Sequence, residues 1–137
     1  MFEVALFNDI KTNFSVTGYT LNFGFGKVLE TTKAPYIVQY SLDTNGDREM
    51  LCEADDFTSG QAFLQWNIYT TNPQNGFKIK VELMKYIASL KQLTLNGDTY
   101  MIQLNQHSSS PSGIDENTGL FVEIVARDIT YNKKQGD

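Results

Sequence analysis

The sequence predicts an α+β fold: a mostly antiparallel sheet of about five strands packed against two helices. Three observations lead to this fold class. The 137 residues are 41% hydrophobic and 20% charged, which is typical of one soluble globular domain with its own core. Several short runs rich in β-branched and aromatic residues, separated by turn residues, predict strands. Two segments with helical periodicity interrupt these runs, which gives the order α-β-β-β-α-β-β. We expect a single domain over residues 1–132 and a disordered tail over residues 133–137.

The N-terminal segment has the spacing of a short amphipathic helix. Phe2, Leu6 and Ile10 recur at positions i, i+4 and i+8, so they share one helical face. The following stretch, residues 17–32, alternates glycines with aromatic and aliphatic residues. This composition is compatible with an irregular strand or with an ordered loop, and both interpretations stay open.

Three strands are expected in the middle of the chain. Pro35 precedes a run of β-branched and aromatic residues over 36–42, and proline is tolerated at the first position of a strand. Residues 43–47 contain an Asn-Gly pair and predict a turn. A second strand should cover residues 48–54, and residues 61–70 supply an aromatic-rich third strand.

A helix is predicted directly after the third strand. Asn72 is a favourable N-cap residue, and Pro73 suits the first helical position, where its missing N–H group has no cost. The helix should continue to Leu90, with apolar residues on two sides. One side carries Phe77, Val81, Met84 and Ala88, and the other carries Ile79, Leu83, Tyr86, Ile87 and Leu90. One side should cover the sheet, while the other packs either within the domain or against a neighbouring subunit.

The C-terminal part predicts a hairpin, a loop and a last strand. Residues 93–95 and 100–104 flank an Asn-Gly pair, which is a specific signal for a two-residue hairpin. Residues 106–118 are rich in Ser, Pro and Gly, so we expect a long polar loop. Residues 120–131 form the last strand, which should pair with residues 100–104.

Charge and cysteine content narrow the possible partners. The net charge of −5 argues against a protein that grips nucleic acid, because such binding depends on clustered Lys and Arg. The lone Cys52 excludes an intrachain disulfide. Apolar runs stay well short of the roughly 20 residues of a membrane span, so we expect no membrane partner.

A possible calcium loop fails on inspection of its later positions. Asp43, Asn45 and Asp47 fit the first three ligand positions of such a loop. Arg48 then replaces the required glycine, and Ala54 stands where a bidentate glutamate should complete the coordination shell. A hairpin turn is the better interpretation, and we predict no metal site.

The residues suited to catalysis lie in unfavourable patterns. His107 is adjacent to Ser108–Ser110 in the same polar loop, with no nucleophile-elbow pattern and no orienting acid beside it. Acid–base chemistry would require the acids at 55–56 to meet those at 115–116, and adjacent acids in polar segments are usually solvated charges. We therefore predict no enzyme, no catalytic residue and no cofactor.

The order of these elements and two local patterns carry a family resemblance. Residues 34–38 read Ala-Pro-Tyr-Ile-Val, and residues 65–70 read Gln-Trp-Asn-Ile-Tyr-Thr before the Asn-Pro helix start. Over about residues 34 to 131 the chain resembles the tail terminator and tail-completion proteins of long-tailed bacteriophages, including the related small neck proteins.

The resemblance implies a structural function. Members of this family assemble into a ring, usually a hexamer, which caps the tail tube and meets the head connector. DNA passes through the lumen without specific binding. The implied location is the virion tail or neck, after assembly in the host cytoplasm. The family brings no catalytic residues to this chain.

Two function hypotheses therefore differ in class. In the first, the chain is a ring subunit whose interface uses the helix residues Phe77, Met84 and Ile87, with Phe23 and Phe25 as further anchors. Its polar loop would contact the tube or the connector through His107, Ser109, Pro111 and Ile114. In the alternative, the chain is a monomeric α+β binding module with an apolar ligand or peptide pocket between sheet and helix.

Overall fold

The computed structural model describes residues 2–42, 59–95 and 97–133. The predicted turn at 43–47 and strand at 48–54 lie outside this part of the chain, as do the acids at 55–56. For residues 105–112 only the main chain is described. The helices are α1 (Phe2–Asn13) and α3 (Pro73–Ser89), with a short 3-10 turn at Thr31–Lys33. The strands are β1 (Asn22–Phe25), β2 (Tyr36–Ser41), β3 (Ser59–Thr70), β4 (Gln92–Leu95), β5 (Asp98–Ile114) and β6 (Phe121–Lys133).

The strands form one sheet in the order β1-β2-β3-β6-β5-β4. Every neighbouring pair is antiparallel except β1 and β2, which run parallel. The predicted α+β class is therefore confirmed, with six strands among the described residues instead of about five. Three strands follow α3 instead of the two in the predicted order. Strand β1 resolves the open interpretation of residues 17–32, because this segment contains a short strand followed by irregular chain and a 3-10 turn.

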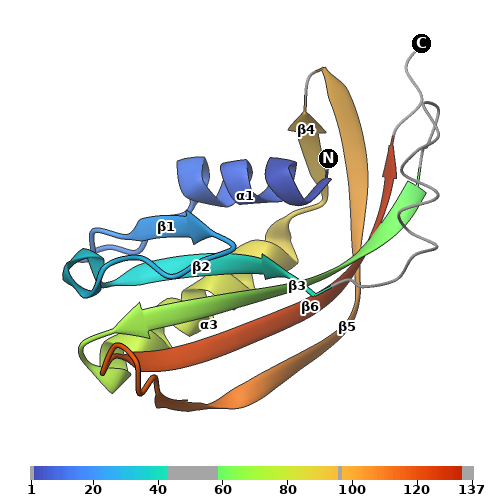
Figure 1. The fold of residues 1–137 in the computed structure, drawn as a ribbon. Coiled ribbons are helices and arrows are strands. Elements are labelled where there is room, and N and C mark those ends of the chain that lie inside the picture. Colours follow the sequence, from blue (N-terminus) through green and yellow to red (C-terminus); the bar gives the residue numbers. More distant parts are fainter. Residues whose placement is uncertain (1, 43–58, 96, 134–137) are drawn as a thin grey trace.

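Both helices lie on the same face of the sheet, which curls around them (Figure 1). Helix α1 contacts β3 and β4, and α3 contacts β3 and β6. The main core is formed here by apolar residues of α1 and α3 and by alternate residues of β3 and β6. The ring of Phe2 stacks on Tyr131 with centroids 4.2 Å apart, which ties the start of α1 to the sheet. No helix in the described part of the chain is both long and apolar enough to span a membrane.

A buried chain of hydrogen bonds fixes α1 against two strands. The indole Nε1 of Trp66 donates to Oε1 of Gln39 at 2.9 Å, and Nε2 of Gln39 donates to the carbonyl oxygen of Glu3 at 2.9 Å. Trp66 and Gln39 are 1% and 2% exposed, so an unmatched polar atom in either would be costly. These two bonds therefore specify how α1 sits over β2 and β3.

The opposite face of the sheet carries a smaller core at one end. The connection from Gly26 to Ala34 crosses this face and packs Leu29 against Tyr36, Val38 and Tyr69. Strand β2 is consequently buried on both faces at this end, with Tyr36 through Gln39 all buried.

Helix α3 starts as its sequence predicts. Oδ1 of Asn72 accepts hydrogen bonds from the main-chain N–H groups of Gln74 and Asn75, at 2.8 and 3.3 Å, and Pro73 occupies the first turn. Gly76 lies where the helix meets the sheet: a Cβ atom there would approach Oγ1 of Thr70 to 3.0 Å. The cap and this small residue together set the entry angle of α3 onto the sheet.

The predicted loop at 106–118 is wrong for most of its length. Strand β5 continues to Ile114, paired with β6, and the chain reverses only between Ile114 and Phe121. The register shifts between Leu104 and His107 and again between Ser110 and Gly113. Such irregularities let a strand accommodate Pro and Gly, because the extra residues are not required to pair. The long β6 supplies a continuous pairing edge that overrides the loop-forming composition.

The other C-terminal predictions are confirmed. Strands β4 and β5 pair from Leu95 and Asp98 outward, and Gly97 has the positive φ, 84°, that the tight hairpin turn requires. Strand β6 pairs with the predicted segment of β5, for example Ile102 with Tyr131. It extends to Lys133, the first residue of the expected tail; residues 134–137 lie outside the described chain.

Candidate functional site

The two apolar sides of α3 have different surroundings. Ile79, Leu83 and Ile87 are at most 1% exposed and form part of the core. On the other side Phe77 is 60% exposed, and Met84 is half-buried against the edge of the core. Ile87 is therefore corrected from an interface candidate to a core residue, because the sheet already covers it within the single chain.

The two phenylalanines of β1 are also placed differently from one another. Phe23 is half-buried and packs against the main core. Phe25 is 47% exposed and makes an edge-on ring contact with Phe7 of α1, with centroids 5.1 Å apart. Only Phe25 presents a large part of its ring to the surface.

The four residues expected to contact a tail partner lie along the second half of β5. His107 pairs in register with Arg127 and Ser109 with Val125, and Pro111 falls in the second register shift. Ile114 ends the strand and is 60% exposed. These residues do not share a loop, although Ile114 remains an accessible apolar side chain beside the turn.

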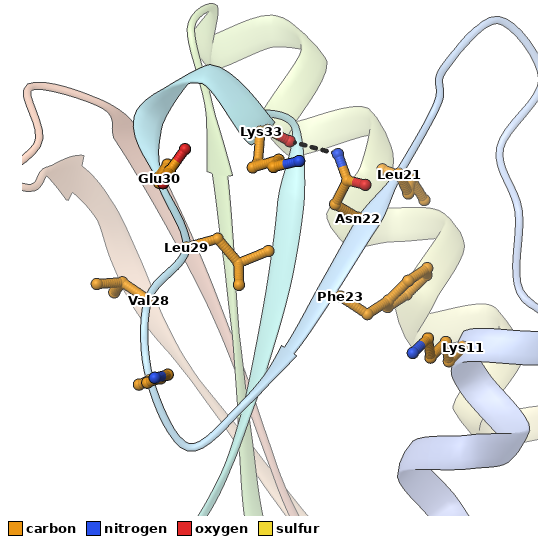
Figure 2. Close-up of a pocket in the computed structure, with 9 residues that line it drawn as sticks. Lys11, Leu21, Asn22, Phe23, Val28, Leu29, Glu30 and Lys33 are labelled. Atoms are coloured by element: carbon orange, nitrogen blue, oxygen red, sulfur yellow. Dashed lines mark hydrogen bonds between the residues drawn. The ribbon is translucent and has the colours of Figure 1, made fainter.

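A groove lies at the free edge of β1, and sequence reasoning missed it. Its volume is about 630 Å³, within the range of small-ligand and peptide sites. Residues of α1, of β1 and of the segment after β1 line it (Figure 2). They are Lys11, Leu21, Asn22, Phe23, Lys27, Val28, Leu29, Glu30 and Lys33.

Local backbone chemistry builds one wall of this groove. A Cβ atom on Gly24 would lie 3.0 Å from the carbonyl oxygen of Lys27 and 3.1 Å from Cδ2 of Leu29. A larger residue would push this wall outward by a few tenths of an ångström, so glycine favours the close return of the chain over the strand. Nδ2 of Asn22 donates to the carbonyl oxygen of Lys33 at 2.7 Å, which closes the far end of the wall (Figure 2).

The rim of the groove is cationic in an otherwise acidic chain. Lys11, Lys27 and Lys33 surround it, with Glu30 as the single acid of the lining. All four side chains are exposed. None of the three lysines forms an ion pair with another residue that the structure describes. Lys11 comes from a different element, so the spacing of charges along the sequence could not reveal this concentration.

Three tyrosines cluster on the opposite face of the sheet. The rings of Tyr36 and Tyr69 stack with centroids 4.8 Å apart. Burial, reinforced by the neighbouring Tyr69, raises the pKa of Tyr36, and the same two causes raise the pKa of Tyr40 to about 12. The surroundings of Tyr36 and Tyr40 therefore disfavour the charged phenolate, which favours packing over proton transfer.

Charged groups suited to chemistry are few in the described residues. No group of three or more His, Cys, Asp or Glu side chains there could hold a metal ion. Nζ of Lys80 and Oε1 of Glu123 form a largely buried ion pair at 3.3 Å between α3 and β6. Burial lowers the pKa of Arg127. The ion pair joins helix and sheet, which is a structural arrangement.

Comparisons with known proteins extend the fold assignment only. No protein-family model and no curated protein sequence matches this chain. Among the solved structures that match is one whose name states no function. It aligns with 99% of this chain and 92% of its own length, at a TM-score of 0.53 and 12% sequence identity. At this identity the likeness supports the α+β fold and indicates no function.

Proposed function

We propose that this chain is an architectural subunit of a ring in the tail or neck of a long-tailed bacteriophage, acting as a tail terminator or tail-completion protein. The proposal combines the family resemblance of residues 34 to 131 with the α+β class of the fold. Six copies would form the ring that caps the tail tube and meets the head connector. DNA would pass through its lumen without specific contacts.

The exposed side of α3 is the observation that carries the proposal. Phe77 is 60% exposed, and Val81 and Met84 lie on the same side, half-buried. Aromatic residues and Met are enriched in protein interfaces, where a central aromatic side chain often dominates the binding energy. The opposite side of α3 is already covered by the sheet, so this side is free to meet a neighbouring copy.

The oligomeric state of the purified protein tests the proposal. We expect light scattering after gel filtration, with the protein at about 50 µM, to give the mass of a closed oligomer. Negative-stain images should show rings. Phe77→Asp should abolish the ring, because it places a charge in the centre of the contact.

Ile114→Asp is the matched control, since Ile114 has the same 60% exposure but lies on β5 and not on α3. It should leave the ring intact and weaken binding to tail tubes. The proposed function would be disproved if the protein stayed monomeric at all concentrations and did not bind tail tubes.

The groove at the β1 edge favours the second candidate, a binding module. Its volume of about 630 Å³ and its mixed apolar and cationic lining suit a ligand or peptide. Native mass spectrometry of freshly purified protein separates the candidates: a monomer carrying a bound molecule favours the module, and a ligand-free oligomer favours the ring.

A further inference from the structure

We propose that the groove beside β1 binds an extended acidic segment of a partner polypeptide, which adds to the sheet as a strand next to β1. The proposal goes beyond ring assembly, because it concerns a surface away from the exposed side of α3 and holds for a monomer as well as for a ring.

The main chain of β1 offers unused hydrogen-bonding groups. The N–H of Asn22 donates to the carbonyl oxygen of Pro35 at 3.1 Å, and the N–H of Gly26 donates to that of Gln39 at 2.9 Å. Successive residues of a strand direct these groups to opposite sides, so Phe23 and Phe25 direct theirs away from β2. Strand β1 ends the sheet, and such an edge is a template for another strand.

The groove flanks this edge on both faces of the sheet. Phe23 is paired with Ile37 and lies on the helix-covered face, with Lys11 beyond it, whereas Leu29 packs on the opposite face. Figure 2 shows β1 running between Leu29 on one side and Phe23 and Lys11 on the other. An added strand sends alternate side chains to the two faces, so both walls would contact it.

Charge selects the chemistry of the occupant. Lys11, Lys27 and Lys33 outnumber Glu30 around the groove, while the whole chain carries a net charge of −5. Acidic side chains on the added strand would meet these lysines at the rim, and apolar ones would cover Phe23 and Leu29. Three lysines on an acidic chain are too few to favour a nucleic-acid backbone over a carboxylate-bearing peptide.

The test uses the full chain, labelled with ¹⁵N, and a blocked synthetic peptide of alternating valine and glutamate. We expect titration to shift the amide resonances of β1 and of the segment 27–33, and to protect the amides of Phe23 and Phe25 from hydrogen exchange. A peptide of alternating valine and lysine should cause no such change.

Charge-reversed variants test whether the lysines around the groove contribute to binding of the acidic peptide. The double variant Lys27→Glu/Lys33→Glu should bind the acidic peptide about tenfold or more weakly than the parent protein does. Lys85→Glu combined with Lys91→Glu changes the net charge equally at exposed positions away from the groove, and it should weaken binding by less than about twofold.

A proline variant tests strand addition separately. Phe25→Pro removes an outward N–H at an edge strand, where proline is tolerated, and Phe25→Ala removes the same ring but keeps the N–H. Both should keep the circular dichroism spectrum of the parent, and only the proline variant should lose peptide binding. If the two variants bind equally well, the peptide is not held by the edge.

Three results would overturn the proposal. The first is peptide-induced shifts centred on the other sheet edge, β4. The second is a shift of the β1 amide resonances that depends on protein concentration and not on the peptide. That result would mean that a second copy of this chain occupies the edge. The third is binding of a thymidine octanucleotide at β1 in preference to the acidic peptide.

Discussion

Asn72 satisfies two main-chain N–H groups that the first turn of α3 would otherwise leave without partners. Its Oδ1 accepts from Gln74 and Asn75, and its own carbonyl oxygen accepts from the N–H of Gly76 and from Oγ1 of Thr70. The residue thus joins the end of β3 to the start of α3. A substitution can remove the helix cap alone, because the side chain caps α3 whereas the main-chain carbonyl holds the corner between β3 and α3.

Replacing this cap should lower stability without changing the fold. We expect Asn72→Ala to reduce the free energy of unfolding by about 1 kcal/mol, because two N–H groups of the first turn lose their acceptor. Urea unfolding followed by circular dichroism measures the change. Asn72→Asp keeps the acceptor and should stay close to the parent; an equal loss in both variants would assign the effect to something other than capping.

Tyr86 should give the protein a specific alkaline sensitivity. Burial, and then a hydrogen bond from its hydroxyl to Asp9, raises its pKa to about 12. The folded state therefore holds this proton more tightly than the unfolded chain, whose tyrosine titrates near pH 10. The stabilisation is complete below pH 10 and is lost as the pH rises toward 12.

The corresponding experiment compares slopes of stability against pH. Tyr86→Phe should make the fall in unfolding free energy between pH 10 and 12 shallower, measured by urea titrations at several pH values. The slope should not vanish, because the pKa of Tyr40 is also raised to about 12. Parallel curves for the parent and the variant would contradict this assignment.

At the scale of elements, the two apolar sides of α3 should contribute unequally to the stability of the fold. Leu83 is fully buried, whereas Phe77 is 60% exposed. Leu83→Ala should cost about 3 kcal/mol of unfolding free energy, since it leaves a cavity in the core. Phe77→Ala should change the stability of the monomer by less than about 0.5 kcal/mol. Similar losses in chemical denaturation would mean that both sides are packed within one chain.

Element predictions succeeded where local chemistry decides structure. The Asn-Pro start of α3 and the Gly97 hairpin were both predictable, because caps and tight turns depend on a few adjacent residues. The segment 106–114 was not, since its Ser, Pro and Gly content favours a loop while its strand state depends on pairing with distant β6. Ile87 was misassigned for a related reason: helical periodicity identifies apolar sides but not which partner covers each.

At the scale of the whole molecule, the central strands should be the most protected part of the sheet. Strand β3 pairs along its full length with β6 and also with β2, whereas β1 and β4 each have one neighbour. We expect amides of β3 and β6 to exchange with solvent only through global unfolding, and those of β4 through local opening. Hydrogen exchange followed by NMR checks this order; β4 amides as slow as those of β3 would contradict it.

The candidate site could be predicted only in part at this scale. The apolar side of α3 that carries Phe77 and Met84 was predictable because these residues follow helical spacing, but its exposure was not. The β1 groove was not, because Lys11 belongs to α1 and reaches the edge only once α1 is seated over the sheet. Residues that come together from separate elements show no regular spacing in the sequence, so such a site can be recognised only from the three-dimensional structure.

The double covering of β2 has a consequence for how this chain tolerates sequence change. In most of the sheet one face of each strand accepts varied residues, so substitutions should be tolerated at every second position. From Tyr36 to Gln39 the chain lies between α1 on one side and the Gly26–Ala34 connection on the other. A saturation library should therefore return four consecutive restricted positions in this strand, in contrast to the alternating pattern along β6.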